Sequence, residues 1–176
     1  MIGMRDVLKQ VEKELSSLLD HDGWQSLDID YHKPHVERVW MPWNGYRINL
    51  HRIQACKPHE ALFHPHPWPS VVRILGTDFG DPMGGGGYWT AIGSGPPDAG
   101  EPAQVAKIWC PAGSIVCMEE PYGWHSVAPP KVSYSLMITG APWQFKMPYE
   151  PGARLRPMDD SKIDDMKYYF KSYFTP

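Results

Sequence analysis

Prolines and glycines divide the middle of this chain into short segments, and this division most constrains how the chain can fold. The 176-residue sequence contains 19 prolines and 16 glycines, concentrated in the connections between short apolar runs. Because both residue types interrupt helices, the middle of the chain is expected to consist of short strands and turns. Helices are expected only near the two ends.

The candidate strands are each bounded by glycine, proline or aspartate and are rich in residues that favour strands. They are Tyr46–Gln54, Ala61–Phe63 leading into His64, Ser70–Leu75, Gln104–Trp109, Ser114–Met118 and Ser133–Thr139. Their spacing favours an all-β antiparallel barrel or jelly roll. The stretch Gly84–Gly100 is expected to be a long loop beside the barrel, in which Tyr88–Ile92 is ordered against the core.

Amphipathic helices are expected at both ends of the chain. From Met4 to Leu19, apolar residues recur at helical spacing with lysine and glutamate between them. A second apolar stripe runs from Ser161 to Phe174, with Asp159 as a candidate cap. We therefore expect one domain over residues 1–176, with an N-terminal helix in 1–22, the barrel at about 40–147 and a C-terminal helix in 158–176.

Composition excludes several classes of protein. Hydrophobic residues make up 42% of the chain and aromatic residues 12%, which argues against disorder. A net charge of -3 without a lysine or arginine block gives no surface for nucleic acid or an anionic membrane. No apolar run approaches a transmembrane helix and the N-terminal segment is charged, so a cytoplasmic location is expected. Three cysteines support neither a disulfide framework nor a four-cysteine zinc site.

The segment His64-Pro65-His66-Pro67-Trp68 contains the strongest functional signal. Each proline keeps the preceding histidine out of helical conformation, so the two histidines lie on an extended segment. Residues two apart on a strand point to the same side, where two imidazoles can bind one metal ion. The alternative is a proline-rich turn with solvated imidazoles. His125, which follows a Pro-Tyr-Gly-Trp turn, is the third candidate ligand.

Between Tyr46 and Trp143 these motifs resemble those of the cupins, small jelly-roll barrels that usually bind a metal. A closer likeness is to a subgroup of uncharacterised bacterial and phage cupins with a His-x-His-Pro-Trp motif. The matching residues are His64, His66 and Gly76 for the first cupin motif, Gly113, Pro121, Gly123 and His125 for the second, and Ile138-Thr139-Gly140 for the subgroup. The resemblance implies a double-stranded β-helix, one bound divalent metal ion and a homodimer.

The glutamate of the first cupin motif has no counterpart here, because Ser70 and Val71 stand where it would fall. Asp78 is the first candidate to replace it, and Asp81 and Glu60 are alternatives. An anionic substrate is the other possible source of negative charge. Three imidazoles suit iron(II), our first choice, and also zinc or nickel, and manganese stays open as a further metal.

Several further residues are candidates for binding or catalysis. Alternation in Tyr46–Gln54 places Arg47 and His51 on one polar face. If this face lines the barrel, Arg47 binds a substrate carboxylate and His51 acts as general base, whereas an outward face would leave both solvated. Tyr134 is a candidate catalytic phenol at the barrel mouth, and Trp68 a candidate wall of the substrate pocket.

Two predictions concern residues away from the metal. Arg73 has the opposite parity to the histidine pair and is expected to point away from the metal. The remaining histidines in turn and loop contexts are expected to be surface residues: His21, His32, His35 and His59.

The sequence thus leaves three functional hypotheses. The first is a metal-dependent cupin enzyme, a non-haem iron dioxygenase acting on a small organic anion at a three-histidine site. The second is a metal-dependent isomerase or lyase in which His51 or Tyr134 moves a proton. The third is a non-catalytic barrel that binds a small molecule or a metal. The fold alone does not separate them.

Overall fold

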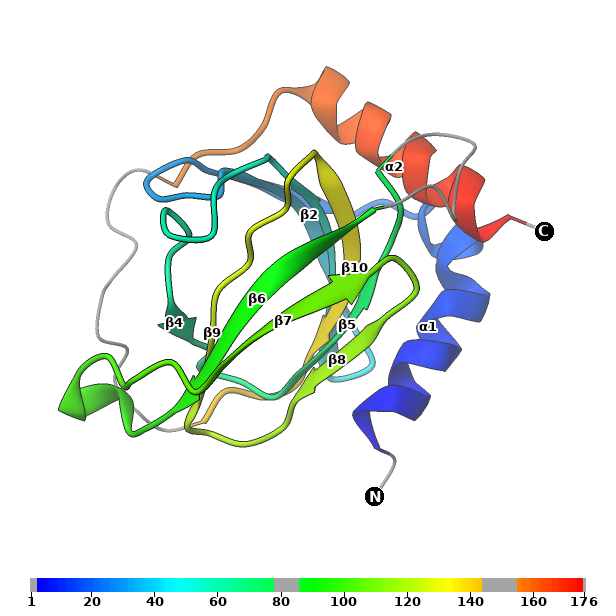
Figure 1. The fold of residues 1–176 in the computed structure, drawn as a ribbon. Helices are drawn as coiled ribbons and strands as arrows, with labels where there is room; N and C mark the ends of the chain where they lie inside the picture. Colours follow the sequence, from blue (N-terminus) through cyan, green and yellow to red (C-terminus); the bar gives the residue numbers. More distant parts are fainter. Residues whose placement is uncertain (1–2, 78–85, 144–154, 176) are drawn as a thin grey trace.

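Two antiparallel sheets lie face to face in the computed structural model, which describes residues 3–77, 86–143 and 155–175 (Figure 1). The larger sheet has the order β1 (Gln25–Ile29), β2 (Val36–Trp43), β3 (Tyr46–Ile53), β10 (Ser133–Thr139), β5 (Ser70–Ile74) and β8 (Ile115–Met118). The smaller sheet has the order β4 (His64–Pro65), β9 (Gly123–His125), β6 (Gly87–Ser94) and β7 (Ala106–Pro111). The architecture is the predicted cupin-type jelly roll with a helix at each end.

Helices α1 (Met4–Leu18) and α2 (Asp160–Phe174) pack together on the outer face of the larger sheet (Figure 1). Both helices begin and end within about one residue of the predicted bounds. Their buried side chains form one core with the sheet, including Leu8, Val11, Leu15, Ile48, Leu50, Val71, Leu136, Ile138, Met166 and Phe170. A short 3-10 helix spans Pro97–Ala99. Among the described residues, no helix is long and apolar enough to cross a membrane.

The larger sheet presents different side chains on its two faces. In β3, Ile48 and Leu50 belong to the helix-covered core, while His51 borders a cavity between the sheets. In β5, Val71 joins the same core and Val72 a second apolar cluster on the inner side. The alternation predicted for β3 is therefore confirmed, and His51 of its polar face borders the interior cavity.

Strands β2 and β3 form a hairpin whose turn consists of Asn44 and Gly45. Both residues have positive φ angles, 48° and 80°, as a two-residue type I′ turn requires. We did not predict β1 or β2 from the sequence. The barrel, expected to begin at about residue 40, begins with β1 at Gln25.

Strand β6 corrects part of the predicted loop at Gly84–Gly100, because Gly87–Ser94 is a strand paired with both β7 and β9. The strand contains Tyr88–Ile92, the segment that was expected to be ordered against the core. Its glycines allow close contacts. A Cβ atom on Gly87 would lie 2.5 Å from the carbonyl oxygen of Cys110, and one on Gly93 would lie 2.8 Å from the ring of Phe63. Glycine content therefore reflects tight packing here and does not indicate a loop.

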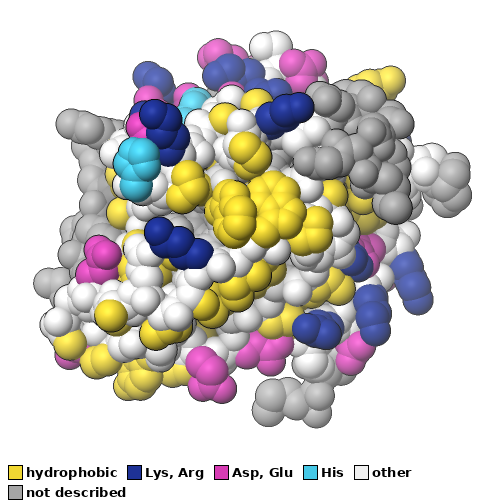
Figure 2. All heavy atoms as spheres, viewed as in Figure 1, with side chains coloured by type: hydrophobic (Ala, Val, Ile, Leu, Met, Phe, Trp, Pro, Cys, Tyr) yellow, Lys and Arg dark blue, Asp and Glu magenta, His cyan; other side chains and the backbone are white. Residues whose placement is uncertain are grey.

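The outer face of the smaller sheet carries exposed apolar side chains. Figure 2 shows apolar groups gathered at the centre of the face on which β6 and β7 lie. The large exposed side chains on this face are Trp89 and Trp109, which are directly opposed across β6 and β7, with their ring centroids 5.6 Å apart. This surface is separate from the interior that the two sheets share.

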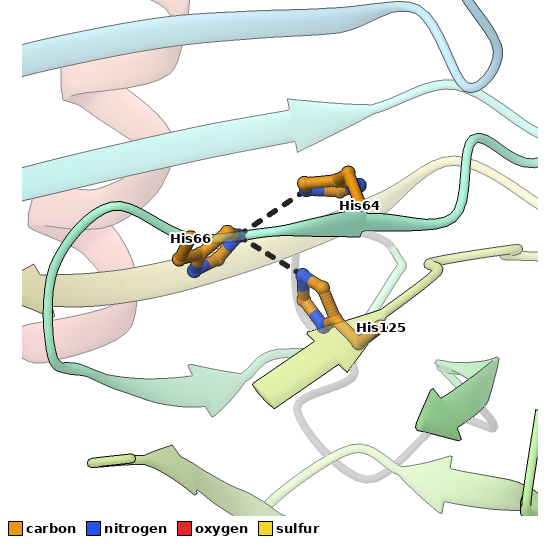
Figure 3. Close-up of side chains that lie close together, drawn as sticks. All are labelled: His64, His66 and His125. Carbon is orange, nitrogen blue, oxygen red and sulfur yellow. Dashed lines mark hydrogen bonds between the residues drawn. The ribbon is translucent and has the colours of Figure 1, made fainter. Parts of the chain in front are cut away.

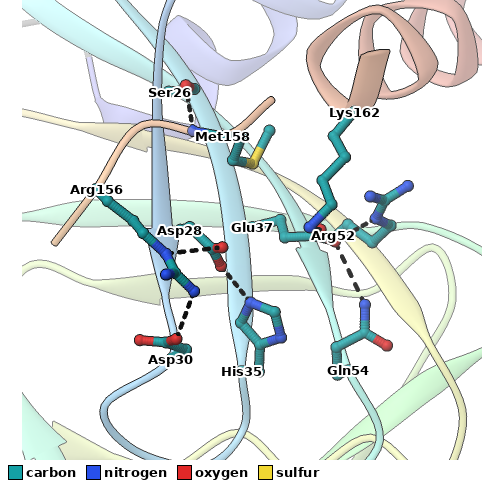
Figure 4. A network of polar contacts seen from close by, with 10 residues as sticks. All are labelled: Ser26, Asp28, Asp30, His35, Glu37, Arg52, Gln54, Arg156, Met158 and Lys162. Atoms are coloured by element: carbon teal, nitrogen blue, oxygen red, sulfur yellow. Dashed lines mark hydrogen bonds and ion pairs between the residues drawn. The ribbon is translucent and has the colours of Figure 1, made fainter. Parts of the chain in front are cut away.

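Polar contacts connect the segment before α2 to the edge of the larger sheet (Figure 4). Arg156 pairs with Asp30 at 3.0 Å, and its carbonyl oxygen accepts a hydrogen bond from the backbone of Asp28. Lys162 of α2 lies 3.1 Å from the buried carboxylate of Glu37. These contacts fix the C-terminal helix on the sheet.

Candidate metal centre

The strand register brings the three predicted histidine ligands together between the two sheets. His64 on β4 and His125 on β9 are directly opposed in an antiparallel pair. His66 lies two residues after His64, on the same side, and its ring points toward both (Figure 3). The extended segment that the prolines impose is therefore part of a strand pair, with all three imidazoles converging on one point.

The spacing of these imidazoles fits a single metal ion. Nε2 of His66 lies 3.2 Å from Nε2 of His64 and 3.0 Å from Nε2 of His125. The ligand atoms of all three residues lie within 4.8 Å of one another. Imidazole nitrogens about 2.1 Å from a metal and at right angles to each other are about 3 Å apart. The three histidines can therefore hold one ion.

Hydrogen bonds orient two of the rings for this role. Nδ1 of His64 donates to the carbonyl oxygen of Leu62 at 3.1 Å, which leaves the Nε2 lone pair directed at the cluster. Nδ1 of His66 lies 3.4 Å from Oγ of Ser70. If Nε2 of His66 carries a proton, it can donate to Nε2 of only one of its two histidine neighbours. One bound cation, in contrast, can accept the Nε2 lone pairs of all three histidines.

Burial keeps the three imidazoles neutral. It lowers the pKa of His64 from the ordinary value of 6.5 to about 4. The pKa of His66 is well below its usual range because of burial and then the neighbouring His125 and His64, and burial does the same for His125. Neutral imidazole is the form that binds metal.

A cavity of about 100 Å³ lies between the sheets beside the three histidines. Among the described residues, no aspartate or glutamate lines it. Its polar lining other than the three histidines comes from His32, Arg38, His51, Tyr88 and Ser135. Its apolar lining comes from Ile29, Pro34, Val36, Ile53, Val72, Val127 and Met137. The cavity is therefore small, largely apolar and without negative charge on these lining residues.

Three of these polar residues form a row across adjacent strands. Arg38 is directly opposite His51, and His51 is directly opposite Ser135. Nε of Arg38 donates to Nε2 of His51 at 2.9 Å, and Nδ1 of His51 lies 3.3 Å from Oγ of Ser135. Because arginine only donates, Nε2 of His51 is the acceptor and Nδ1 carries the proton.

This hydrogen bond does not favour the predicted role of His51 as general base, which stays a prediction. Its one lone pair is directed at Arg38, and burial and then the Arg38 charge hold the pKa of His51 well below its usual range. His51 instead holds the arginine in place.

The two predicted substrate-binding residues lie together, outside the cavity that the histidines border. Arg47 and Trp68 both line a neighbouring surface groove. The guanidinium of Arg47 stacks over Trp40, 4.3 Å from the ring centroid. The ring centroids of Trp68 and His66 are 5.4 Å apart, so Trp68 lies next to the histidine cluster. The structure thus brings Trp68, but not Arg47, next to a histidine of the candidate metal site.

Tyr134 lies on the opposite face of the larger sheet from the histidines. Its ring stacks on Tyr169 of α2 at a centroid distance of 3.7 Å, while its neighbour Ser135 faces the cavity. Strand alternation explains this correction: Tyr134 has the outward parity of β10. Arg73 points away from the site, as predicted, and pairs with Glu12 of α1 at 2.7 Å.

No carboxylate joins the histidine cluster within the part of the chain that the structure describes. Asp78, the first candidate to replace the motif glutamate, and Asp81, one of the two alternatives, lie outside the described residues. Glu60, the third candidate, pairs with Lys33 at 2.9 Å at the protein surface. Ser70 stands in the glutamate's place and contacts His66.

Sequence reasoning missed several residues of the cavity, including the polar residues His32, Arg38, Tyr88 and Ser135. His32 was expected at the surface but lines the cavity, with its ring centroid 6.4 Å from that of His64. Arg38 was missed because β2 was not predicted. The Asn44-Gly45 turn could have identified β2, and alternation along it then places Arg38 inside.

Comparison with known proteins gives no family assignment. No protein-family model matches the chain, and no curated protein matches it. Among solved structures, hydroxypropylphosphonic acid epoxidase from S. wedmorenis is 15% identical with a TM-score of 0.47, over 68% of this chain and 56% of that one. The chain therefore spans little more than half the length of that enzyme.

Two other solved structures show similarly weak likenesses. A protein from Photorhabdus luminescens is 10% identical with a TM-score of 0.43, over 66% of this chain and 81% of that one. Streptomyces albus HEPD, with 2-hydroxyethylphosphonate and Fe(II) bound, is 10% identical with a TM-score of 0.41, over 61% of this chain and 21% of that one. Scores and identities this low define neither a family nor an activity for this chain.

Proposed function

We propose that this protein is a metal-dependent enzyme, a non-haem iron dioxygenase that acts on a small organic anion. The observation that carries the proposal is the convergence of three Nε2 atoms, from His64, His66 and His125, at the spacing of ligands on one ion. They border a cavity that has room for a small molecule beside the metal position.

The ligand set favours iron(II) and an anionic substrate. Three histidines on one side of a six-coordinate ion leave positions open for both substrate and dioxygen. Bound iron(II) supplies the redox chemistry that activates dioxygen, which no side chain provides. Since the three imidazoles are neutral and no carboxylate among the described residues lines the cavity, an anionic substrate would balance the metal's charge.

The chain's own residues contribute positioning and exclusion of water. His64 is oriented by its hydrogen bond to the Leu62 carbonyl, and His66 by its contact with Ser70. Val72 and Met137 of the larger sheet contribute apolar surface to the cavity. Tyr88 also lines the cavity, and burial raises the pKa of its phenol, which keeps the group neutral.

The alternatives derive less support from the site. An isomerase or lyase of the kind predicted needs His51 or Tyr134 as its proton carrier. His51 accepts a hydrogen bond from Arg38, and Tyr134 stacks on α2. A non-catalytic metal-binding or small-molecule-binding barrel is the runner-up. The homodimer stays a prediction, for which sedimentation velocity is the test; the apolar stripe of α1 packs within its own chain.

Oxygen uptake tests this proposal. The protein is purified without a chelating tag, loaded with iron(II) under anaerobic conditions and mixed with oxygen and a panel of small thiols and carboxylates. We expect substrate-dependent oxygen consumption that is lost in His125→Ala. Zinc or nickel in the purified protein without oxygen uptake would favour isomerase or lyase chemistry, and failure to bind any metal would favour the binding module.

A further inference from the structure

The cavity beside the histidines contains a positive charge with no counter-charge among the residues that the structure describes. Arg38 lines this cavity, and its Nε atom donates to His51. No aspartate or glutamate of the described residues lines the cavity or pairs with this guanidinium. Burial, and then the nearby charge of Arg47, lowers the pKa of Arg38 from 12.5 to about 10, so Arg38 stays protonated at neutral pH.

An uncompensated charge in such a place is costly to the folded protein. Buried charges in proteins are ordinarily paired or bind a ligand of opposite charge. Two other arginines of the larger sheet follow this rule: Arg52 pairs with Glu37, and Arg73 pairs with Glu12. Arg38 is different because it faces the cavity, where space is available for a ligand.

The row of inner side chains holds Arg38 in a fixed orientation. His51 accepts from Nε at 2.9 Å and is itself in contact with Ser135 at 3.3 Å. Because Nε is occupied, the two terminal nitrogens Nη1 and Nη2 remain for a ligand. Two parallel N–H groups of a guanidinium match the two oxygens of a carboxylate. The Arg38 guanidinium is therefore oriented for binding a carboxylate before any ligand is present.

We propose that Arg38, positioned by His51 and Ser135, binds the carboxylate of a small aliphatic acid in this cavity. The acid's apolar part lies against the aliphatic lining, which includes Val72, Val127 and Met137. The inference rests on the proposed function for the identification of this acid as the substrate. It assigns a binding residue that the cupin motifs do not contain, and the volume of about 100 Å³ restricts the ligand to a small molecule.

Calorimetric titration tests the assignment. Acetate, propionate and isobutyrate, and the three corresponding uncharged amides, are titrated into the iron-loaded protein and into the protein after chelation. We expect at least one acid to bind both forms and its amide to bind neither. Arg38→Gln is expected to weaken binding of that acid to the chelated protein by about 30-fold or more, as loss of one partner of a buried charge pair does.

The matched control is Arg5→Gln, which removes the same charge from the exposed surface of α1. It is expected to leave acid binding within about twofold of wild type, because exposed charges interact weakly at this range. Circular dichroism and a thermal melt establish that both variants are folded. Retention of the acid-dependent rise in melting temperature by Arg38→Gln would overturn the assignment.

The two proposals fail in different ways. Acid binding to the chelated protein that depends on Arg38, without oxygen uptake by the iron-loaded protein, would support the carboxylate site and contradict the oxygenase. Oxygen uptake that is unchanged in Arg38→Gln would support the oxygenase and contradict the carboxylate site. Equal binding of the acid and its amide, or no binding of any of the three acids to wild type, would also overturn the inference.

Discussion

The hydroxyl of Ser70 stands where the first cupin motif has a glutamate, and it contacts a histidine of the candidate metal site. Oγ of Ser70 lies 3.4 Å from Nδ1 of His66, and the side chain is buried at the start of β5. In the place of a charged ligand, this position therefore has a neutral group that contacts a candidate ligand, His66. Partners of this kind affect both the tautomer and the direction of a metal-binding imidazole.

We expect Ser70→Ala to weaken metal affinity by about tenfold, because His66 loses the contact that orients its ring. Competition with a chelating indicator dye measures the affinity. Ser133→Ala is the control: its hydroxyl is buried without a partner in the described regions and does not line the cavity. Equal affinities in the two variants would show that Ser70 does not orient the ligand.

The acid titration of His64 tests whether the free site is as buried as the structure indicates. In the metal-free protein, the imidazole signals of His64 in NMR spectra should shift with a midpoint near pH 4, because burial lowers its pKa. In the unfolded chain the same group binds its proton near pH 6.5. Between these two pH values His64 binds more protons in the unfolded state than in the folded state. The contribution of His64 to the free energy of unfolding therefore falls as the pH decreases from about 6.5 to about 4. A midpoint near 6.5 in the folded protein would contradict this burial.

Glu37 links three elements of the fold through one buried carboxylate (Figure 4). It lies on β2 and accepts hydrogen bonds from Arg52 of β3 and Lys162 of α2, the latter at 3.1 Å. Burial alone would raise the pKa of Glu37, but these two cations outweigh burial and hold it below 4.5. The sheet edge and the C-terminal helix therefore share a polar contact in addition to the apolar core.

We expect Glu37→Ala to lower the free energy of unfolding by about 3 kcal/mol or more, because it leaves Arg52 partly buried without its partner. Urea denaturation at neutral pH measures the change. Because the folded-state pKa is lowered, the contribution of Glu37 to stability is present above pH 4.5 and is lost as the pH falls through the folded-state pKa.

Glu60→Ala is the matched control for this variant, because its pair with Lys33 is largely solvent-exposed. We expect it to change stability little. If the two variants lose the same stability, the buried carboxylate does not have the structural role that we assign to it.

The sequence predicted the helices well because their apolar residues recur at a clear helical spacing. The strands were harder to predict where local composition and tertiary packing disagree. Strand β6 has the glycines of a loop, but Gly87 and Gly93 are close to neighbouring segments that leave no room for a side chain. Only the packed structure reveals this. Strand β2, by contrast, was predictable from the Asn44-Gly45 turn that follows it.

The candidate metal site could be predicted only in part, for a similar reason. His64 and His66 share a motif, so their common orientation follows from local spacing alone. The cavity residue Arg38 is far from the motif in sequence and reaches it only through the register of β2 with β3. Tyr134 was assigned to the wrong face because its strand parity depends on which side the helices cover, which the sequence of β10 does not state.

At the scale of the whole molecule, the main apolar core and the candidate site lie on opposite sides of the larger sheet. The helices cover the outer face with the largest apolar core, and the cavity lies between the inner face and the smaller sheet. His64 lies on β4, His66 follows β4 directly, and His125 lies on β9. Strands β4 and β9 are short and pair with each other at one edge of the smaller sheet. A bound ion would connect these short segments.

Metal removal should therefore lower the melting temperature of the protein without unfolding it at room temperature. A ligand that binds only the folded state at about 100 times its dissociation constant stabilises that state by about 2.7 kcal/mol. Differential scanning calorimetry of iron-loaded and chelated samples measures the shift. The helix-covered core does not involve the histidines, so far-ultraviolet circular dichroism should remain the same at room temperature. Identical melting curves would indicate that no ion binds at the strand pair.

The metal content of single histidine variants tests the central claim most directly. Wild-type protein and the variants His64→Ala, His66→Ala and His125→Ala are loaded with iron(II) anaerobically, desalted and measured by elemental analysis, with His59→Ala, at an exposed turn, as control. We predict about one ion per chain in wild type and control, and loss of the ion in each of the three variants while the fold is retained. Full metal content in all three folded variants would contradict the assignment of this site.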